Sequence, residues 1–138
     1  LFNKINAYFG GDLRGKTVAF WGLSFKPGTD DMREAPSVVL ANLLLDAGAH
    51  VRAYDPVAIE EAKHDLGDTI TYCQSDMDAV QGADALALIT EWTEFRLPNW
   101  EKVGAAMNTK VVFDGRNLYR SAIVAEVGFD YYGIGINK

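Results

Sequence analysis

Cysteine, histidine and long apolar runs are all scarce in this chain of 138 residues. The one cysteine, Cys73, has no disulfide partner, which is typical of a reducing compartment, so we expect a cytoplasmic location. The two histidines, His50 and His64, lack metal-ligand spacing, and we expect no metal site. No apolar run reaches membrane-spanning length, and the first residues do not resemble a signal peptide. We therefore expect a domain held together by its hydrophobic core, with no membrane partner.

Positive charge is scarce as well. The chain has 13 lysines and arginines against 19 acidic residues, which gives a net charge of −6. General binding of nucleic acid needs a basic face, so this composition argues against it. Binding of a small anion is still compatible with it, because a few well-aimed cations suffice locally. Since 49% of the residues are hydrophobic, the chain is long and apolar enough for one compact domain with one core.

Segments with strand and helix patterns alternate along the chain. Helices are expected at residues 37–48, 57–67, 75–83, 99–107 and 120–128. Strands are expected at residues 16–22, 50–56, 69–73, 84–90, 110–115 and 130–135. The alternation predicts right-handed βαβ crossovers, and so one α/β domain with a doubly wound, mainly parallel sheet and helices on both faces, a Rossmann-like three-layer sandwich. Because apolar residues surround nearly the whole helix at 37–48, we expect it to be deeply packed.

The first nine residues form a further expected helix. They place five apolar side chains on one helical face, and Gly10 and Gly11 end the helix. One interpretation is that residues 1–10 are the end of an interdomain helix, so that the domain itself spans residues 11–138. The other is a short N-terminal helix that packs on its own domain. The sequence favours neither.

The segment WGLSFKPGTDDMREAPS, at residues 21–37, links the first long strand to the helix that follows it. In a nucleotide-binding unit this link is a short glycine-rich turn, because the backbone must approach phosphate. Here the link is long and charged, and only Gly22 lies at the strand end, where a dinucleotide fingerprint needs three glycines. Asp55, at the end of the second strand, has the position of a ribose-binding acid. Because Pro56 follows it, we favour a turn or helix-start role for Asp55.

Three cations are expected to meet at one edge of the sheet. Open α/β sheets bind ligands beyond the carboxyl ends of their strands. Lys26 and Arg33 follow the first strand and Arg116 follows the fifth, and such cations beside a helix N-terminus favour a diphosphate. Three acids of the link are expected to orient these cations and to cap the next helix. The three acids are Asp30, Asp31 and Glu34.

These motifs together carry a family resemblance. GLSFKPGTDDMREAPS, followed by GAHVRAYDP, TEW and FDGRN, resembles the C-terminal domain of the UDP-glucose/GDP-mannose dehydrogenase family, and TEW favours its UDP-glucose branch. The similarity runs from about Lys4 to the end of the chain. It implies an enzyme with an N-terminal NAD-binding domain and a central dimerising domain, both absent from this chain. Such an enzyme oxidises the C6 alcohol of a UDP-sugar to a carboxylate with two NAD, and this domain grips the UDP.

The resemblance also implies roles for single residues. Phe25 and Lys26 match residues that contact the UDP-sugar, and Arg116 matches an arginine that helps to bind it. Arg33 matches an arginine that reaches the pyrophosphate of NAD held by another domain. The catalytic cysteine of the family belongs to a glycine-rich motif that Cys73 does not match. We therefore expect no catalytic residue here, an inactive fragment, and a homodimer for the full-length enzyme.

Simpler interpretations of these residues stay open. Lys26 is by itself an ordinary surface lysine, Arg33 can pair with Asp30 or Glu34, and Arg116 can cap a helix. Two other functions also stay open. One is a structural or assembly module of a related nucleotide-sugar dehydrogenase, acting on UDP-N-acetylhexosamine or GDP-mannose. The other is an autonomous NAD-binding domain.

Overall fold

The computed structural model describes residues 1–134, so that Gly135, the last residue of the expected final strand, lies outside the described residues. Strands and helices alternate along the chain as predicted. The strands are β1 Thr17–Trp21, β2 His50–Tyr54, β3 Thr71–Tyr72, β4 Ala85–Leu88, β5 Val111–Asp114 and β6 Asp130–Gly133. The helices are α1 Phe2–Tyr8, α2 Pro36–Asp46, α3 Ile59–Leu66, α4 Asp76–Val80, α5 Trp100–Ala106 and α6 Ser121–Glu126, with a 3₁₀ turn, η1, at Thr93–Phe95.

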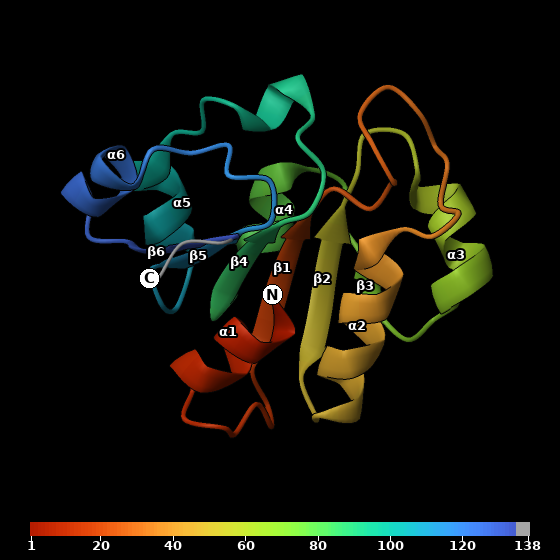
Figure 1. Cartoon of the computed structure of the whole chain (residues 1–138), viewed down its shortest axis with the longest axis horizontal. Coiled ribbons are helices and arrows are strands. Elements are labelled where there is room, and N and C mark those ends of the chain that lie inside the picture. Colours follow the sequence, from red (N-terminus) through yellow and green to blue (C-terminus); the bar gives the residue numbers. More distant parts are fainter. Residues whose placement is uncertain (135–138) are drawn as a thin grey trace.

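The six strands form one parallel sheet in the order β3-β2-β1-β4-β5-β6. The arrows of β1 and β2 point upward in Figure 1, so the carboxyl ends of the strands lie at the top of that view. Strand order reverses between β1 and β4, and ligands of open α/β sheets bind beside such a reversal. The prediction of a doubly wound α/β domain is confirmed.

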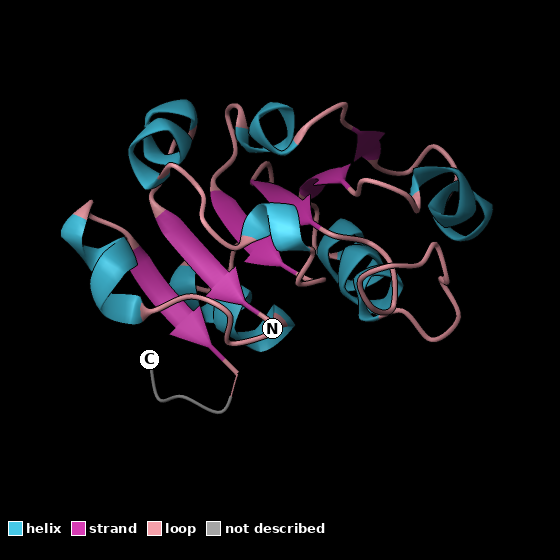
Figure 2. Cartoon of the chain, turned by 90° about the horizontal axis from the view of Figure 1, so that it is seen from above, coloured by secondary structure: helices cyan, strands magenta, loops and turns pink. Residues whose placement is uncertain are grey.

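The helices cover both faces of the sheet, which makes three layers (Figure 2). Along β1 successive side chains face opposite ways: Val18 and Phe20 pack with α1, α2 and α3, whereas Ala19 and Trp21 pack with α4, α5 and α6. Both faces of this strand are therefore buried, which is why it carries apolar residues continuously.

The ends of the helices mostly follow from local sequence. Gly10 has a positive φ directly after α1, Pro36 occupies the first turn of α2, and the Ser75 hydroxyl accepts a hydrogen bond from the Asp78 N–H at the start of α4. The start of α2 differs from the prediction. Its N-cap is Ala35, without a side-chain cap, so the acids of the link do not cap this helix.

Packing of α2 and α1 was only partly predictable. One side of α2 is buried on the sheet, but Val39 and Leu43 are 62% and 42% exposed, so the prediction of a deeply packed helix is wrong for its outer side. Helix α1 packs on its own domain through Ile5, which is fully buried. This contact is what the second interpretation of the helix requires, and the interdomain origin of residues 1–10 stays a prediction.

Candidate functional site

The loops that follow β1 and β4 touch at the point where strand order reverses. Gly22 has a φ of +96°, and a Cβ atom added there would lie 2.4 Å from the Cβ of Thr90. The Thr90 hydroxyl donates a 2.7 Å hydrogen bond to the carbonyl oxygen of Ser24. Thr90 thus fills the place where the backbone of a dinucleotide fold approaches phosphate. This packing explains why glycine stands at position 22 and counts against an autonomous NAD-binding domain.

Beyond Gly22 the backbone of residues 23–26, here called the link turn, is held by hydrogen bonds at nearly every residue. The N–H groups of Leu23 and Ser24 donate to one oxygen of Asp55, at 2.8 and 3.1 Å, and the hydroxyl of Ser37 donates to the Leu23 carbonyl. The Phe25 N–H donates to the Asp31 carbonyl. The link turn is therefore a rigid platform, although it belongs to a long and charged link.

Phe25 and Lys26 project outward from this platform. Phe25 is 44% exposed and Lys26 is exposed. The ammonium group of Lys26 forms no hydrogen bond or ion pair with the part of the chain that the structure describes. A cation held on a fixed backbone without a protein partner is available for an anionic ligand.

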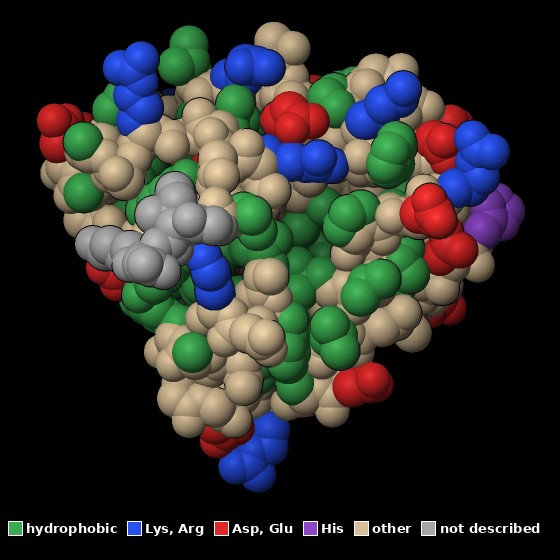
Figure 3. Space-filling view, in the orientation of Figure 1, with side chains coloured by type: hydrophobic (Ala, Val, Ile, Leu, Met, Phe, Trp, Pro, Cys, Tyr) green, Lys and Arg blue, Asp and Glu red, His purple; other side chains and the backbone are tan. Residues whose placement is uncertain are grey.

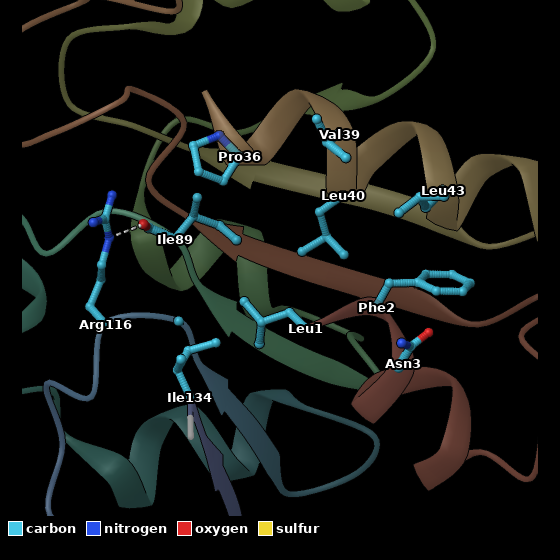
Figure 4. Close-up of a pocket in the computed structure, with 11 residues that line it drawn as sticks. Leu1, Phe2, Asn3, Pro36, Val39, Leu40, Leu43, Ile89, Arg116 and Ile134 are labelled. Atoms are coloured by element: carbon cyan, nitrogen blue, oxygen red, sulfur yellow. Dashed lines mark hydrogen bonds between the residues drawn. The ribbon is translucent and has the colours of Figure 1, made fainter. Parts of the chain in front are cut away.

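Arg116 connects the link turn to the loops after β4 and β5. Its Nε donates to the Ile89 carbonyl at 2.8 Å (Figure 4), and its Nη2 donates to the Phe25 carbonyl at 2.9 Å. Glu91 lies 3.6 Å from Nε. The structure thus brings Arg116 and Phe25 together, as residues predicted for the same ligand require. It also gives Arg116 a structural contact that the sequence did not indicate.

Arg33 lies at another part of the same edge. Its guanidinium group forms a two-point ion pair with Asp31, at 2.9 and 3.0 Å, and its side chain is 89% exposed. It borders a hollow lined also by Glu61 and His64 of α3, whereas Arg116 lines a groove together with residues of α2 and with Ile89, which follows β4. Arg33 and Arg116 thus line different hollows. The ion pair expected with Asp30 or Glu34 is formed with Asp31 instead.

Arg33→Ala is expected to return the pKa of Asp31 from about 2 toward its ordinary value of 3.8, because the hydrogen bond from Arg33 is the main cause of the low pKa. The pair stabilises the fold above about pH 3.8 and loses this contribution as the pH falls toward 2. NMR titration of the Asp31 carboxyl carbon measures the change. Asp12, paired in the same way with Arg14, is the matched control and should not move. An unchanged Asp31 pKa would contradict the pairing.

Two buried acids organise the edge, and sequence reasoning assigned neither of them to the site. Asp114 is fully buried, and its oxygens accept hydrogen bonds from the N–H groups of Arg116 and Tyr119 and from the hydroxyl of Tyr131. Burial, together with the hydrogen bond to Asp114, raises the pKa of the Tyr131 hydroxyl. The signal that could have found both acids is a shared pattern: an aromatic residue, Asp and then Pro or Gly at the end of a strand, YDP and FDG.

Asp55 is the second buried acid, with 2% of its surface exposed. One carboxylate oxygen accepts from the N–H groups of Val57 and Ala58 at the start of the β2–α3 connection. The other accepts from the link turn and from the indole N–H of Trp92, 3.1 Å away. The turn role favoured for Asp55 is confirmed, although α3 begins after Ala58 without a side-chain cap. The oxygens of Asp55 are already engaged by protein donors rather than free for a ribose.

An apolar groove of about 800 Å³ lies beside Arg116, between α1, α2 and the loop after β5. Figure 3 shows the hollow floored by hydrophobic side chains, and Figure 4 shows Arg116 and Ile89 at one end, with Phe2 and Leu43 at the other. The exposed side chains of α2 border this groove. A ligand or protein surface with both apolar and anionic parts would match it.

Other kinds of site receive no support. Among residues 1–134 no three His, Cys, Asp or Glu side chains are grouped so as to hold a metal ion, and no helix is long and apolar enough to cross a membrane. Cys73 is buried, and burial raises the pKa of its thiol. This environment is unlike that of a reactive cysteine, which is exposed and has a lowered pKa.

The model of the UDP-glucose/GDP-mannose dehydrogenase family, UDP binding domain, matches residues 19–121. The chain belongs to this family. The match spans the link turn, Asp55, Trp92 and Arg116. The family resemblance read from the sequence is confirmed, and the groups at this edge belong to a UDP-binding domain.

Relatives of this UDP-binding domain include longer proteins. UDP-glucose 6-dehydrogenase from Pseudomonas aeruginosa is 49% identical over 140 residues, which cover 98% of the chain and 31% of that protein. UDP-glucose 6-dehydrogenase YwqF from Bacillus subtilis is 43% identical over 91% of the chain and 28% of its own length. The structure of a UDP-glucose dehydrogenase from Pyrobaculum islandicum superposes with a TM-score of 0.80 at 33% identity, covering 96% of the chain and 28% of that structure. The chain thus spans about a third of the length of the curated relatives it matches.

Proposed function

We propose that this UDP-binding domain binds the UDP-sugar of a UDP-glucose 6-dehydrogenase, which oxidises UDP-glucose to UDP-glucuronate with two NAD in the intact enzyme. The observation that carries the proposal is the unpaired Lys26 ammonium on the rigid link turn, joined through Phe25 to Arg116. Relatives at 43% and 49% identity that bear this enzyme name support the choice of sugar. The intact enzyme is proposed to be a cytoplasmic homodimer whose other domains supply the rest of the active site.

The three proposed substrate-binding residues have different tasks. Lys26 supplies positive charge to the diphosphate, and Phe25 supplies an apolar ring beside it. Arg116 uses Nε and one Nη2 hydrogen on protein carbonyls, which leaves its remaining N–H groups for the nucleotide sugar. Charge-assisted hydrogen bonds of this kind are each worth roughly 1.5–3 kcal/mol.

NAD, the hydride acceptor of the proposed reaction, is proposed to be held mainly by another domain. Within this chain Thr90 closes the place where a dinucleotide would approach the sheet, so the residues do not fit NAD there. A contact with NAD at Arg33 does fit the residues present. The Arg33 guanidinium group is exposed, and some of its N–H groups do not face Asp31 and can bind a ligand outside this domain. The proposed role of Arg33 is therefore to reach a phosphate that another domain presents.

The chain is proposed to be inactive on its own. Its one cysteine, Cys73, has a buried thiol with a raised pKa, which does not suit the covalent chemistry implied for the family. No catalytic residue is assigned within the chain.

Lys26→Ala is expected to weaken UDP binding roughly tenfold, because it removes one charge-assisted contact. Since the side chain forms no hydrogen bond or ion pair with the described residues and only attracts the Asp31 carboxylate, the free energy of unfolding should change little. Isothermal titration calorimetry with UDP and urea denaturation measure the two quantities. Lys102→Ala removes an exposed lysine of α5 that lines neither the groove beside Arg116 nor the hollow beside Arg33, and it should change neither quantity. Equal UDP affinities for wild type and Lys26→Ala would contradict the proposed site.

The apolar groove favours an alternative function as an assembly module. Its exposed side chains, Val39 and Leu43 among them, form a surface of the kind that mediates contacts between proteins. Gel filtration with and without UDP separates the two functions. A stable oligomer that ignores UDP would favour assembly, whereas a monomer that binds UDP would favour the substrate-binding role.

A further inference from the structure

Asp55 is held in an unusual way for a buried acid. A buried carboxylate is costly unless hydrogen bonds replace its lost water, and it most often has a cation beside it. Asp55 forms no ion pair with any described residue. It accepts five hydrogen bonds instead, all from N–H groups of three different loops. Its carboxyl group is thus held by the segments that surround the carboxyl edge of the sheet.

The two carboxylate oxygens of Asp55 accept hydrogen bonds from different loops. One binds the start of the β2–α3 connection, at Val57 and Ala58, which is rooted on β2 beside β1. The other binds the link turn after β1 and the indole of Trp92 after β4. A single carboxylate therefore sets the spacing between the loops of three adjacent strands.

A chain of hydrogen bonds connects Asp55 to the backbone of Lys26. Asp55 fixes the N–H of Ser24, the hydroxyl of Ser24 donates to the Lys26 carbonyl at 2.9 Å, and Thr90 holds the Ser24 carbonyl. Ser24 is fully buried. A shift of Ser24 must move the backbone of Lys26, which is the residue proposed to meet the diphosphate.

We propose that Asp55 is a positioning residue for nucleotide binding: through Ser24 it fixes the backbone from which Lys26 reaches the diphosphate. The proposal rests on the proposed function of this edge and adds a residue that does not touch the ligand. In a dinucleotide fold an acid at this strand end binds the ribose directly. Here the same position acts on the ligand through the protein.

Asp55→Asn tests the proposal, because asparagine keeps the size but turns an N–H₂ group toward donors that need an acceptor. UDP affinity is expected to fall roughly tenfold by calorimetry. In a Lys26→Ala background the same substitution should have almost no further effect, since its influence passes through Lys26. A purely structural role would give the same loss of affinity in both backgrounds. Asp84→Asn is the matched control, because Asp84 accepts from the Thr17 N–H at the opposite edge.

Amide hydrogen exchange gives a readout that needs no ligand. In Asp55→Asn the N–H groups of Leu23 and Ser24 should lose protection, while that of Phe20, inside β1, should keep it. If wild type shows no UDP binding, the proposed function fails, and the exchange data still decide whether Asp55 holds the link turn. Unchanged protection at Leu23 and Ser24, or equal losses of affinity in both backgrounds, would overturn the proposal.

Ser24→Ala provides a second variant in case Asp55→Asn does not fold. It removes only the hydroxyl that joins the anchored turn to the Lys26 carbonyl. UDP affinity is expected to fall about threefold to tenfold, again only when Lys26 is present. Full affinity in Ser24→Ala would contradict the route from Asp55 to Lys26.

Discussion

Replacing Arg116 with alanine is expected to weaken UDP binding by roughly a hundredfold, more than any other single substitution at this edge. The change removes a charge-assisted contact to the nucleotide sugar. It also leaves the carbonyl groups of Ile89 and Phe25 without their donors, so that the link turn keeps only the Thr90–Ser24 hydrogen bond as a side-chain tie to the loop after β4. Calorimetry with UDP measures the affinity, and urea denaturation should show a loss of about 1–3 kcal/mol in stability.

Arg116→Lys separates the two contributions. Lysine keeps the positive charge, but its single ammonium group cannot reproduce the fork that spans both carbonyls. If the tie to the link turn matters, this variant should bind UDP much more weakly than wild type although its charge is unchanged. Arg120→Ala, which removes an exposed arginine at the start of α6, is the control and should keep full affinity. If Arg116→Ala binds UDP as tightly as wild type does, Arg116 is not part of the binding site.

Gly22→Ala is expected to lower the free energy of unfolding by roughly 2–4 kcal/mol, the largest stability effect that we predict. An added methyl group would lie 2.4 Å from the Cβ and 2.6 Å from the backbone nitrogen of Thr90, so the loops after β1 and β4 must separate. The φ of +96° adds strain for any residue with a side chain. Urea denaturation measures the loss, and UDP affinity should fall with it because Ser24 moves with Thr90.

Gly28→Ala is the matched control for this prediction. Gly28 also has a positive φ, of +82°, but an added Cβ would meet no atom within 4 Å. Its substitution should therefore cost only the backbone strain, about 1 kcal/mol. Equal losses of stability for the two variants would mean that the contact with Thr90 is unimportant.

The fold was predictable because its signals are local or periodic. The strand expected at 16–22 is Thr17–Trp21, and the helices expected from residues 37 and 75 begin at Pro36 and, after the Ser75 cap, at Asp76. The packing of α2 was not predictable in the same way. Its sequence is apolar on nearly all sides, and periodicity cannot tell which apolar side meets the sheet and which borders a groove.

The hydrogen bonds of the site were beyond sequence reasoning for a different reason. Arg116 binds the carbonyl of Phe25 across 91 positions of the chain, and Asp55 binds Trp92 across 37. Such pairs depend on where the loops of separate strands end, which the residue types alone do not encode. The residue types did identify Phe25, Lys26 and Arg116 as site candidates, and one acid of the link, Asp31, does pair with a cation as expected. They did not indicate that the acids at the strand ends, Asp55 and Asp114, hold the loops together.

The burial of Cys73 makes the domain well suited to site-specific chemistry. Because 3% of its surface is exposed and the pKa of its thiol is raised, Cys73 should not react with maleimide reagents in the folded state. A second cysteine introduced at an exposed position would then carry a dye or spin label alone, with no need to replace the native thiol. Reaction of Cys73 itself would report that the domain has opened.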